Sequence, residues 1–326
     1  MARRRPDESD IRIRPPRSTR PRSKDRPEHK SAISARVVTV DRGRTLCRTE
    51  NDIFVNAMKA RELGKNSVVV GDLVNLVGDT SGMEGTLARI VGVQPRKNLL
   101  SRTIDDAGAF EKTIASNIDQ MLIVAASANP EPRHGFIDRC LAVAFDQGIT
   151  PIIVMTKSDL SDPKDFLETY SALDVITYAT QRGADLSSIK NQLAGKSSVL
   201  IGHSGVGKST LVNALLGEKH RATGDVNDAT GRGRHTSSSA IAFELPSGGT
   251  IIDTPGVRSF GLEHIDKSRV IGSFEELQPG LALCPKNCSH DEEKCGLNGF
   301  IADRPDLQRR VAGLRRILTA SAQPIT

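Results

Sequence analysis

The sequence is poor in aromatic side chains and has no long apolar segment. Its 326 residues include no Trp, two Tyr and nine Phe. It contains no uninterrupted apolar run of about 18 residues, the length that a membrane-spanning helix needs. The basic, Pro-rich N-terminus lacks the apolar core of a secretory signal. We therefore expect a cytoplasmic protein that does not act at a membrane.

Cysteine is also scarce, and its five residues fall into two groups. Cys47 and Cys140 stand alone in apolar or strand-like surroundings and are interpreted as buried thiols. The other three lie in CPKNCSHDEEKC, which has the spacing C-x3-C-x-H-x4-C. In a cytoplasmic protein such a cluster favours a metal over a disulfide. Three thiolates and one imidazole form a closed tetrahedral set, so we expect one structural Zn²⁺ per chain, with free thiols or a disulfide as the alternative. The expected ligands are Cys284, Cys288, His290 and Cys295.

Positive charge is concentrated at the N-terminus. The first 30 residues hold 11 Lys and Arg against 5 Asp and Glu, an excess equal to the net charge of +6 of the whole chain. Five prolines and few apolar residues accompany this charge, so residues 1–31 are expected to form a disordered basic arm. Such arms bind nucleic-acid phosphates in a salt-dependent way. A solvated tail is the alternative.

Residues 32–98 have the pattern of short strands separated by Gly, Asp and Asn. The segments are ISARVVTV, TLCRT, DIFVN, SVVVGDLVNLVG and GTLARIVGV. This pattern indicates a small all-β barrel of the oligonucleotide-binding (OB) type. Single-strand binders of this fold stack bases on aromatic platforms. Because Phe54 is the only aromatic residue here, we expect contacts to RNA backbone and shape, or a barrel that only supports its neighbour.

After a linker, QPRKNLLSRT, apolar strands alternate with helical segments through residues 99–265. This alternation predicts an α/β domain with a mostly parallel sheet covered by helices on both faces. Ligands in such folds bind at the carboxyl ends of the strands.

One motif at such a position is GHSGVGKS, which matches G-x-x-x-x-G-K-[ST] between a strand, SSVLIG, and a helical segment, KSTLVNALLG. Its glycines and the helix N-terminus are expected to hold the β-phosphate of a nucleotide. Lys208 is expected to reach the β- and γ-phosphates, and the Ser209 hydroxyl to bind Mg²⁺. The expected phosphate-binding residues are Gly202, His203, Ser204, Gly205, Val206, Gly207, Lys208, Ser209 and Thr210.

The segment TIIDTPGV, in which Asp253 ends another strand, supplies further residues that could bind the triphosphate and its Mg²⁺. Asp253 is the expected carboxylate for Mg²⁺, and the Gly256 N–H is expected to contact the γ-phosphate. In the polar segment before it, Thr236 is expected to offer its hydroxyl to Mg²⁺ and its backbone to the γ-phosphate. Such a segment would order with the triphosphate and relax after hydrolysis. A plain surface loop is the alternative.

The segment TKSD, residues 156–159, follows another buried strand and points to guanine. Guanine presents two N–H donors side by side, and the Asp159 carboxylate can accept both while the Lys157 stem covers the ring. Adenine would leave that carboxylate unpaired, at a cost of about 1–3 kcal/mol. We expect Thr156, Lys157, Ser158 and Asp159 to bind the guanine nucleotide. In ordinary guanine-nucleotide switches this motif follows the phosphate loop, whereas here it precedes the loop.

The order TKSD, GHSGVGKST, GRHTSSS and DTPGV, between a barrel and a Cys/His cluster, resembles the RsgA family of circularly permuted GTPases over roughly residues 32–320. The resemblance implies a GTPase domain at 99–265 and a helical zinc-binding domain at 266–326. It also implies a monomer that binds GTP or GDP, the small (30S) ribosomal subunit and its 16S rRNA. Such a protein would act late in subunit maturation and leave after hydrolysis. Two departures are Thr156 in place of Asn, and Ala179-Thr180 in place of Ser-Ala.

Two other functions stay open at this point. A P-loop ATPase or kinase with an RNA-binding barrel would require TKSD to be accidental. A non-enzymatic RNA-binding protein would use nucleotide only as a structural ligand.

Beside the Cys/His cluster, RVIGSFEELQ and PDLQRRVAGLRRILTA are predicted as amphipathic helices, with the Arg pairs facing RNA or solvent.

Catalysis needs a group that positions water, and Val257 stands after DTPG, where many switch GTPases have Gln. His235 is the nearest candidate, as the matching His of RsgA-like proteins implies. A loop His with a purely structural role is the alternative.

We expect His235→Ala to lower ribosome-stimulated phosphate release while nucleotide affinity stays nearly intact. Equal release rates in the two proteins would remove His235 from the mechanism.

Overall fold

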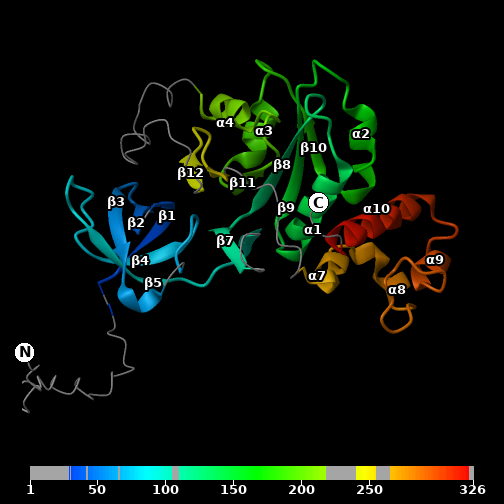
Figure 1. Ribbon diagram of the computed structural model, residues 1–326, viewed down its shortest axis with the longest axis horizontal. Helices are drawn as coiled ribbons and strands as arrows, with labels where there is room; N and C mark the ends of the chain where they lie inside the picture. Colours follow the sequence, from blue (N-terminus) through cyan, green and yellow to red (C-terminus); the bar gives the residue numbers. More distant parts are fainter. Residues whose placement is uncertain are drawn as a thin grey trace, which may run out of the picture. The chain divides into compact units, whose positions relative to one another are not determined.

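Alternating apolar residues build a closed barrel at the start of the chain. The computed structural model describes residues 29, 31–41, 43–64, 67–104, 110–217, 240–254 and 265–322. Within these residues the barrel strands are β1 (Ile33–Asp41), β2 (Arg44–Thr49), β3 (Phe54–Lys59), β4 (Leu73–Gly78) and β5 (Ala88–Val93). They pair in the order β1-β2-β3-β5-β4, and β4 returns to β1, which closes the barrel (Figure 1). Val37, Val55 and Ile90 are fully buried inside it. The expected barrel is thus confirmed, and almost all of the arm (1–31) lies outside the described residues.

A mostly parallel sheet follows the barrel. Its strands are β8 (Gln120–Ala126), β9 (Thr150–Thr156), β10 (Ile176–Ala179), β11 (Ser197–Ile201), β12 (Ile241–Glu244) and β13 (Thr250–Asp253). They lie in the order β10-β9-β8-β11-β13-β12, and β12 alone among these strands runs antiparallel to its sheet neighbour β13. A single register pair, Thr39 with Ile241, joins β12 to β1 of the barrel.

Helices bury both faces of this sheet. The helices are α1 (His134–Asp146), α2 (Lys164–Glu168), α3 (Ser187–Leu193) and α4 (Lys208–Leu216). Short 3₁₀ turns lie elsewhere along the chain, at Arg61–Leu63 in the barrel, at Ser171–Leu173 after α2 and at Glu275–Leu277 near the C-terminus. On β8, Met121 and Ile123 belong to the core beneath α1, whereas Leu122 and Val124 belong to the core beneath α3 and α4. Figure 1 shows α1 and α4 on opposite sides of the sheet. The near-continuous apolar composition of the strands follows from this two-sided burial.

Two segments differ from the sequence-based expectation. The linker at 94–103 contains a strand, β6 (Leu99–Ile104), which pairs with β7 (Phe110–Ser116), and Leu100 is fully buried. The helix expected over 269–278 is broken into α7 (Lys267–Gly272) and a 3₁₀ turn. Phe274 turns into the core between them, at 1% exposure, and lies edge-on to Phe145 of α1. The helix thus ends at Gly272, two residues before this buried ring.

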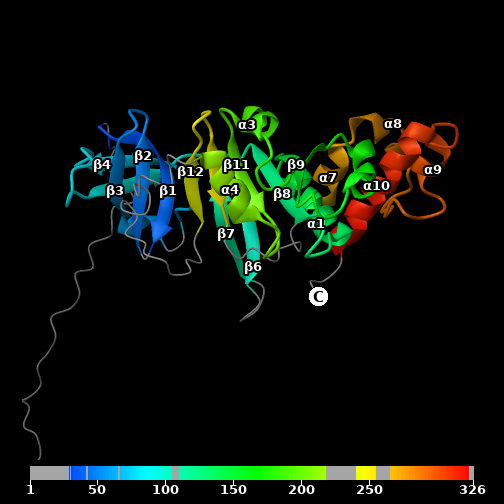
Figure 2. The same ribbon diagram turned by 90° about the horizontal axis from the view of Figure 1, so that it is seen from above.

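The C-terminal helices are α8 (Gln278–Leu281), α9 (Gly296–Phe300) and α10 (Pro305–Ala322). The expectation that the Arg pairs of α10 face RNA or solvent is wrong for most of them. Arg316 binds the buried Asp138 of α1 at 2.8 Å, and Arg310 binds Asp174 at 2.7 Å and Glu276. Figure 2 shows α10 beside α1.

In the described part of the chain, the helices are too short or too polar to cross a membrane.

A buried carboxylate ties the barrel to the strand that leads into the sheet. Asp72 is fully buried and accepts hydrogen bonds from the Val69 N–H at 2.8 Å and the Ser116 hydroxyl at 2.6 Å. Arg96 donates to both of its oxygens, at 2.7 and 2.8 Å. Ser116 ends β7 and Asp72 precedes β4, so one side chain connects both parts.

We expect Asp72→Asn to lower the free energy of unfolding by about 3 kcal/mol, because it leaves the half-buried Arg96 without its counter-charge. Urea unfolding followed by circular dichroism measures this loss. The matched control is Asp52→Asn, which removes an exposed pair with Arg48 and should cost at most about 0.5 kcal/mol. Equal losses in the two variants would contradict the role given to Asp72.

Candidate nucleotide-binding site and metal centre

The phosphate-loop motif forms a tight loop between β11 and α4. A Cβ at Gly202 would lie 2.3 Å from the Val124 carbonyl oxygen of β8, so only glycine fits where the loop passes this strand. Gly207 has φ of +91°, a conformation that side chains rarely adopt. α4 begins at the next residue, and Gly207, as its N-cap, provides no side-chain hydrogen bond. The first N–H groups of α4 therefore remain available to an anion.

Lys208 is held over this loop. Its ammonium donates to the carbonyl oxygens of Gly202 at 2.5 Å and His203 at 2.8 Å. Burial lowers the pKa of Lys208, and the nearby Asp253 carboxylate opposes this shift. A lysine that is partly desolvated beside helix N–H groups is suited to bind a phosphate.

Asp253 ends β13 beside the strand that carries the loop. It lies opposite Leu200 of β11 in register, and the Thr254 hydroxyl donates to the Leu200 carbonyl at 2.8 Å. Burial raises the pKa of Asp253, and Lys208 opposes that shift. Ser209 is exposed at the start of α4. The Asp253 carboxylate and the Ser209 hydroxyl therefore lie at the same edge of the sheet, and both are oxygen donors of the kind that suits Mg²⁺. His235, Thr236 and Gly256 lie outside the described residues.

The TKSD segment lies beside the phosphate loop. A pocket of about 550 Å³ is lined by Thr156, Lys157 and Asp159 on one side and by Gly207 and Thr210 on the other. The Lys157 ammonium donates to the Asn129 carbonyl in the loop after β8. The structure thus brings together the two motifs that the sequence presents in reversed order, because each follows a parallel strand at the same sheet edge.

The end of β10 completes the pocket. The Ser158 N–H donates to the Thr180 carbonyl at 3.2 Å, and the Thr180 N–H donates to the Met155 carbonyl at 2.8 Å. Gln181 and Arg182 follow Thr180 and also line the pocket. Sequence analysis did not single out these two residues. Their place directly after a parallel strand was the available signal.

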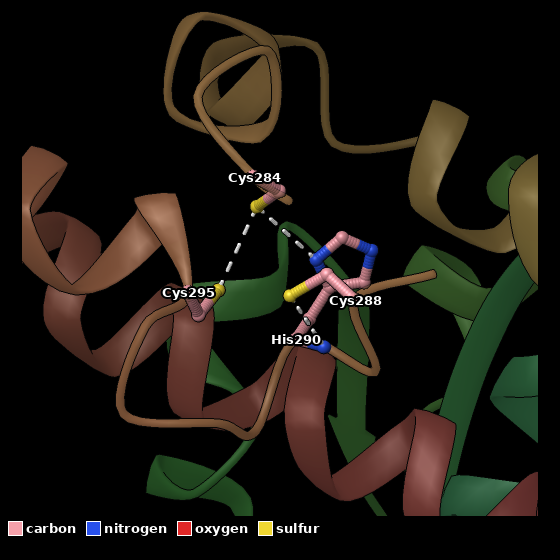
Figure 3. A group of neighbouring side chains, drawn as sticks. All are labelled: Cys284, Cys288, His290 and Cys295. Carbon is pink, nitrogen blue, oxygen red and sulfur yellow. Dashed lines mark hydrogen bonds between the residues drawn. The ribbon is translucent and has the colours of Figure 1, made fainter. Parts of the chain in front are cut away.

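The four metal-ligand candidates converge between α8 and α10. Their ligand atoms all lie within 4.8 Å of one another (Figure 3). The Cys284 sulfur is 3.7 Å from the Cys295 sulfur and 3.6 Å from Nδ1 of His290. A tetrahedron with zinc–sulfur bonds of about 2.3 Å places two sulfurs about 3.8 Å apart. The donor set and its spacing therefore fit a structural zinc ion. Cys47 and Cys140 are buried elsewhere, as expected.

Neighbouring residues hold this cluster in shape. Arg315 of α10 donates to the His290 carbonyl at 2.6 Å and to Oδ1 of Asn298 at 2.6 Å. A Cβ at Gly296, directly after Cys295, would lie 2.7 Å from the Gly280 carbonyl. The close approach of α9 to α8 thus requires glycine. Partners of this kind orient metal ligands.

A phosphate loop and a guanine-type motif at one edge of a parallel sheet, in reversed chain order, define the class of circularly permuted GTPases. A family model described as RsgA GTPase matches residues 93–263. The Small ribosomal subunit biogenesis GTPase RsgA of Hahella chejuensis is 39% identical over 264 residues, which cover 77% of this chain and 73% of that protein. The protein of the same name from Chromohalobacter salexigens is 35% identical over 295 residues, covering 86% and 84%.

Solved structures agree with this comparison. The crystal structure of YjeQ from Thermotoga maritima matches with a TM-score of 0.64 and 25% identity, covering 88% of this chain and 99% of that one. YloQ, a circularly permuted GTPase, has the same fold with a TM-score of 0.61, 22% identity and coverage of 93% and 100%. The chain belongs to the RsgA family of GTPases.

Proposed function

We propose that this GTPase binds the small (30S) ribosomal subunit, acts in its late maturation and is released on GTP hydrolysis. The observation that supports this most is the single pocket lined by the TKSD segment and the phosphate loop, in a chain whose relatives are named small ribosomal subunit biogenesis GTPases. The proposal includes the domain boundaries expected from the sequence, which are 32–98, 99–265 and 266–326. It also includes a monomeric protein in the cytoplasm.

Within this pocket, the Asp159 carboxylate would accept the two guanine N–H groups, and the Lys157 stem would cover the ring. Lys208 and the N–H groups at the start of α4 would bind the β- and γ-phosphates. Ser209, Thr236 and Asp253 would hold Mg²⁺, which neutralises phosphate charge when bound.

Hydrolysis would depend on residues near the γ-phosphate that lie beyond the described part of the chain. His235 would position the attacking water, and the Gly256 N–H would contact the γ-phosphate. Turnover by the protein alone should be slow, because Val257 offers no hydrogen bond to water.

One face of the barrel suits RNA. Met58 of β3 lies opposite Arg44 of β2 and Arg89 of β5, and all three side chains are exposed. Phe54 is on the same face of β3, at 43% exposure. Arginines in such a row would bind 16S rRNA phosphates, which agrees with the expectation that this barrel contacts RNA backbone and shape. The basic arm would add salt-dependent affinity.

The test is GTP hydrolysis measured alone, with 30S subunits and with 50S subunits. We expect 30S subunits to accelerate phosphate release about tenfold or more and 50S subunits to have little effect. A Lys208→Ala protein, which should lose the acceleration, controls for contaminating GTPases. Acceleration by 50S alone, or none, would contradict the ribosomal proposal, and tighter binding of ADP than of GDP would favour the ATPase or kinase alternative.

We also propose that the cysteine cluster holds one zinc ion that stabilises the C-terminal module. Cys288→Ser should lower the zinc content from about one ion per chain and lower the melting temperature, because metal binding supplies folding free energy in a small module. Elemental analysis and thermal unfolding measure both effects. Cys47→Ala, which removes a buried thiol outside the cluster, should keep the zinc. Equal zinc contents in both variants would rule out the assignment.

A further inference from the structure

Two loops at one end of the barrel carry an exposed apolar patch. Ile53, in the loop between β2 and β3, is 39% exposed, and Phe54 follows it at the start of β3. Met83 and Leu87 lie in the loop between β4 and β5, at 65% and 45% exposure. These four make up half of the eight large hydrophobic side chains that are exposed in the described part of the chain. Single exposed apolar residues are normal, whereas a group of them marks an interaction site.

The two loops touch each other, so their side chains form one surface. A Cβ at Gly82 would lie 2.7 Å from Cγ2 of Ile53 and 2.6 Å from the Phe54 carbonyl oxygen. Gly82 also has φ of +75°, so this close contact requires glycine. Met83 is the next residue and therefore lies beside Ile53.

Hydrogen bonds within the β4–β5 loop hold the backbone of Met83 in place. Oδ1 of Asp79 accepts from the Ser81 N–H at 3.0 Å and from the Ser81 hydroxyl at 2.6 Å. The Thr86 hydroxyl donates to the Met83 carbonyl at 2.6 Å. A partner therefore meets an apolar side chain on a loop that is already ordered, which lowers the entropy cost of binding.

Acidic residues surround this apolar patch. Residues 49–54 and 78–87 contain no Lys or Arg. Four exposed carboxylates lie in the same two segments: Glu50, Asp52, Asp79 and Glu84. Like charges that face each other across an interface oppose binding, so these carboxylates would repel RNA phosphates. The patch therefore differs from the neighbouring face with Arg44 and Arg89, and it favours a partner that carries positive charge.

We propose that the patch binds a basic protein surface of the small ribosomal subunit. That surface would place an apolar side chain against Met83 and Ile53, and Lys or Arg side chains against the acidic rim. An apolar centre with a polar rim is typical of protein–protein interfaces, and complementary charge selects the partner. The inference rests on the proposed binding of the 30S subunit. The barrel would then contact rRNA through its arginine face and a protein through the patch at its end.

Reversal of one charge distinguishes a protein partner from RNA. Fluorescence anisotropy measures the affinity of the full-length protein for 30S subunits and for protein-free 16S rRNA, with a non-hydrolysable GTP analogue bound. We expect Glu84→Lys to weaken binding to 30S subunits about fivefold without weakening binding to 16S rRNA. Met83→Ser should give the same selective loss, because it removes apolar contact area. The matched control is Glu62→Lys, an exposed position of the same barrel outside both loops, which should not weaken binding to 30S subunits.

An RNA partner would give the opposite sign, because an added Lys strengthens binding to phosphates. Stronger binding of Glu84→Lys to 30S subunits would therefore overturn the proposal. Equal losses on 30S subunits and on 16S rRNA would do the same, as would unchanged affinity in both Glu84→Lys and Met83→Ser. Circular dichroism checks that the variants keep the wild-type fold.

A photo-crosslink identifies the partner directly. The full-length protein with benzoylphenylalanine in place of Met83 is irradiated on 30S subunits. We expect an adduct that resists ribonuclease and contains a basic ribosomal protein. An adduct with 16S rRNA, or no adduct although the protein is bound, would overturn the proposal. Failure of the wild-type protein to bind 30S subunits would instead contradict the proposed ribosomal function, and this inference would fall with it.

Discussion

The site depends on one geometric constraint, which is that parallel strands end at the same edge of a sheet. β8, β9, β10, β11 and β13 are parallel, and the candidate nucleotide residues follow their carboxyl ends. The chain order of the loops does not affect where they meet. TKSD and the phosphate loop can therefore exchange their order in the sequence and still line one pocket. Circular permutation leaves the chemistry of the site unchanged because that chemistry is set by position in space.

The sheet also connects the candidate site to the barrel. β12 and β13 follow the phosphate loop in sequence, and β12 pairs with β1 of the barrel. Arg48 of the barrel also forms an ion pair with Glu244 of β12, at 2.5 Å. The strand that precedes Asp253 is therefore bonded on its outer side to the barrel. One sheet joins the proposed RNA-binding face to the edge that would hold Mg²⁺.

The phosphate loop and TKSD were predictable because each combines a short pattern with a strand before it. The C-x3-C-x-H-x4-C cluster needed only residue types and spacing. The position of the phosphate loop beside TKSD followed from the rule that parallel strands end at the same edge of a sheet. The partners of Arg310 and Arg316 were not predictable, since an Arg on a helix has the same pattern whether it meets solvent or a buried Asp138 more than 170 residues away. β6 was missed because its polar residues resemble a linker until β7 pairs with it.

Helix α1 is the element that the phosphate loop and the C-terminal module share. Phe136 in its first turn lies 4.2 Å from the ring of His203 in the phosphate loop. Asp138, two residues further on, is bound by Arg316 of α10, and Asp146 at its end accepts from the Asp266 N–H at the start of α7. Because close-packed contacts transmit small displacements, a shift of α1 caused by the phosphate loop would also displace α7 and α10 of the C-terminal module. The connection runs through one rigid helix and does not require the segment between Asp253 and α7.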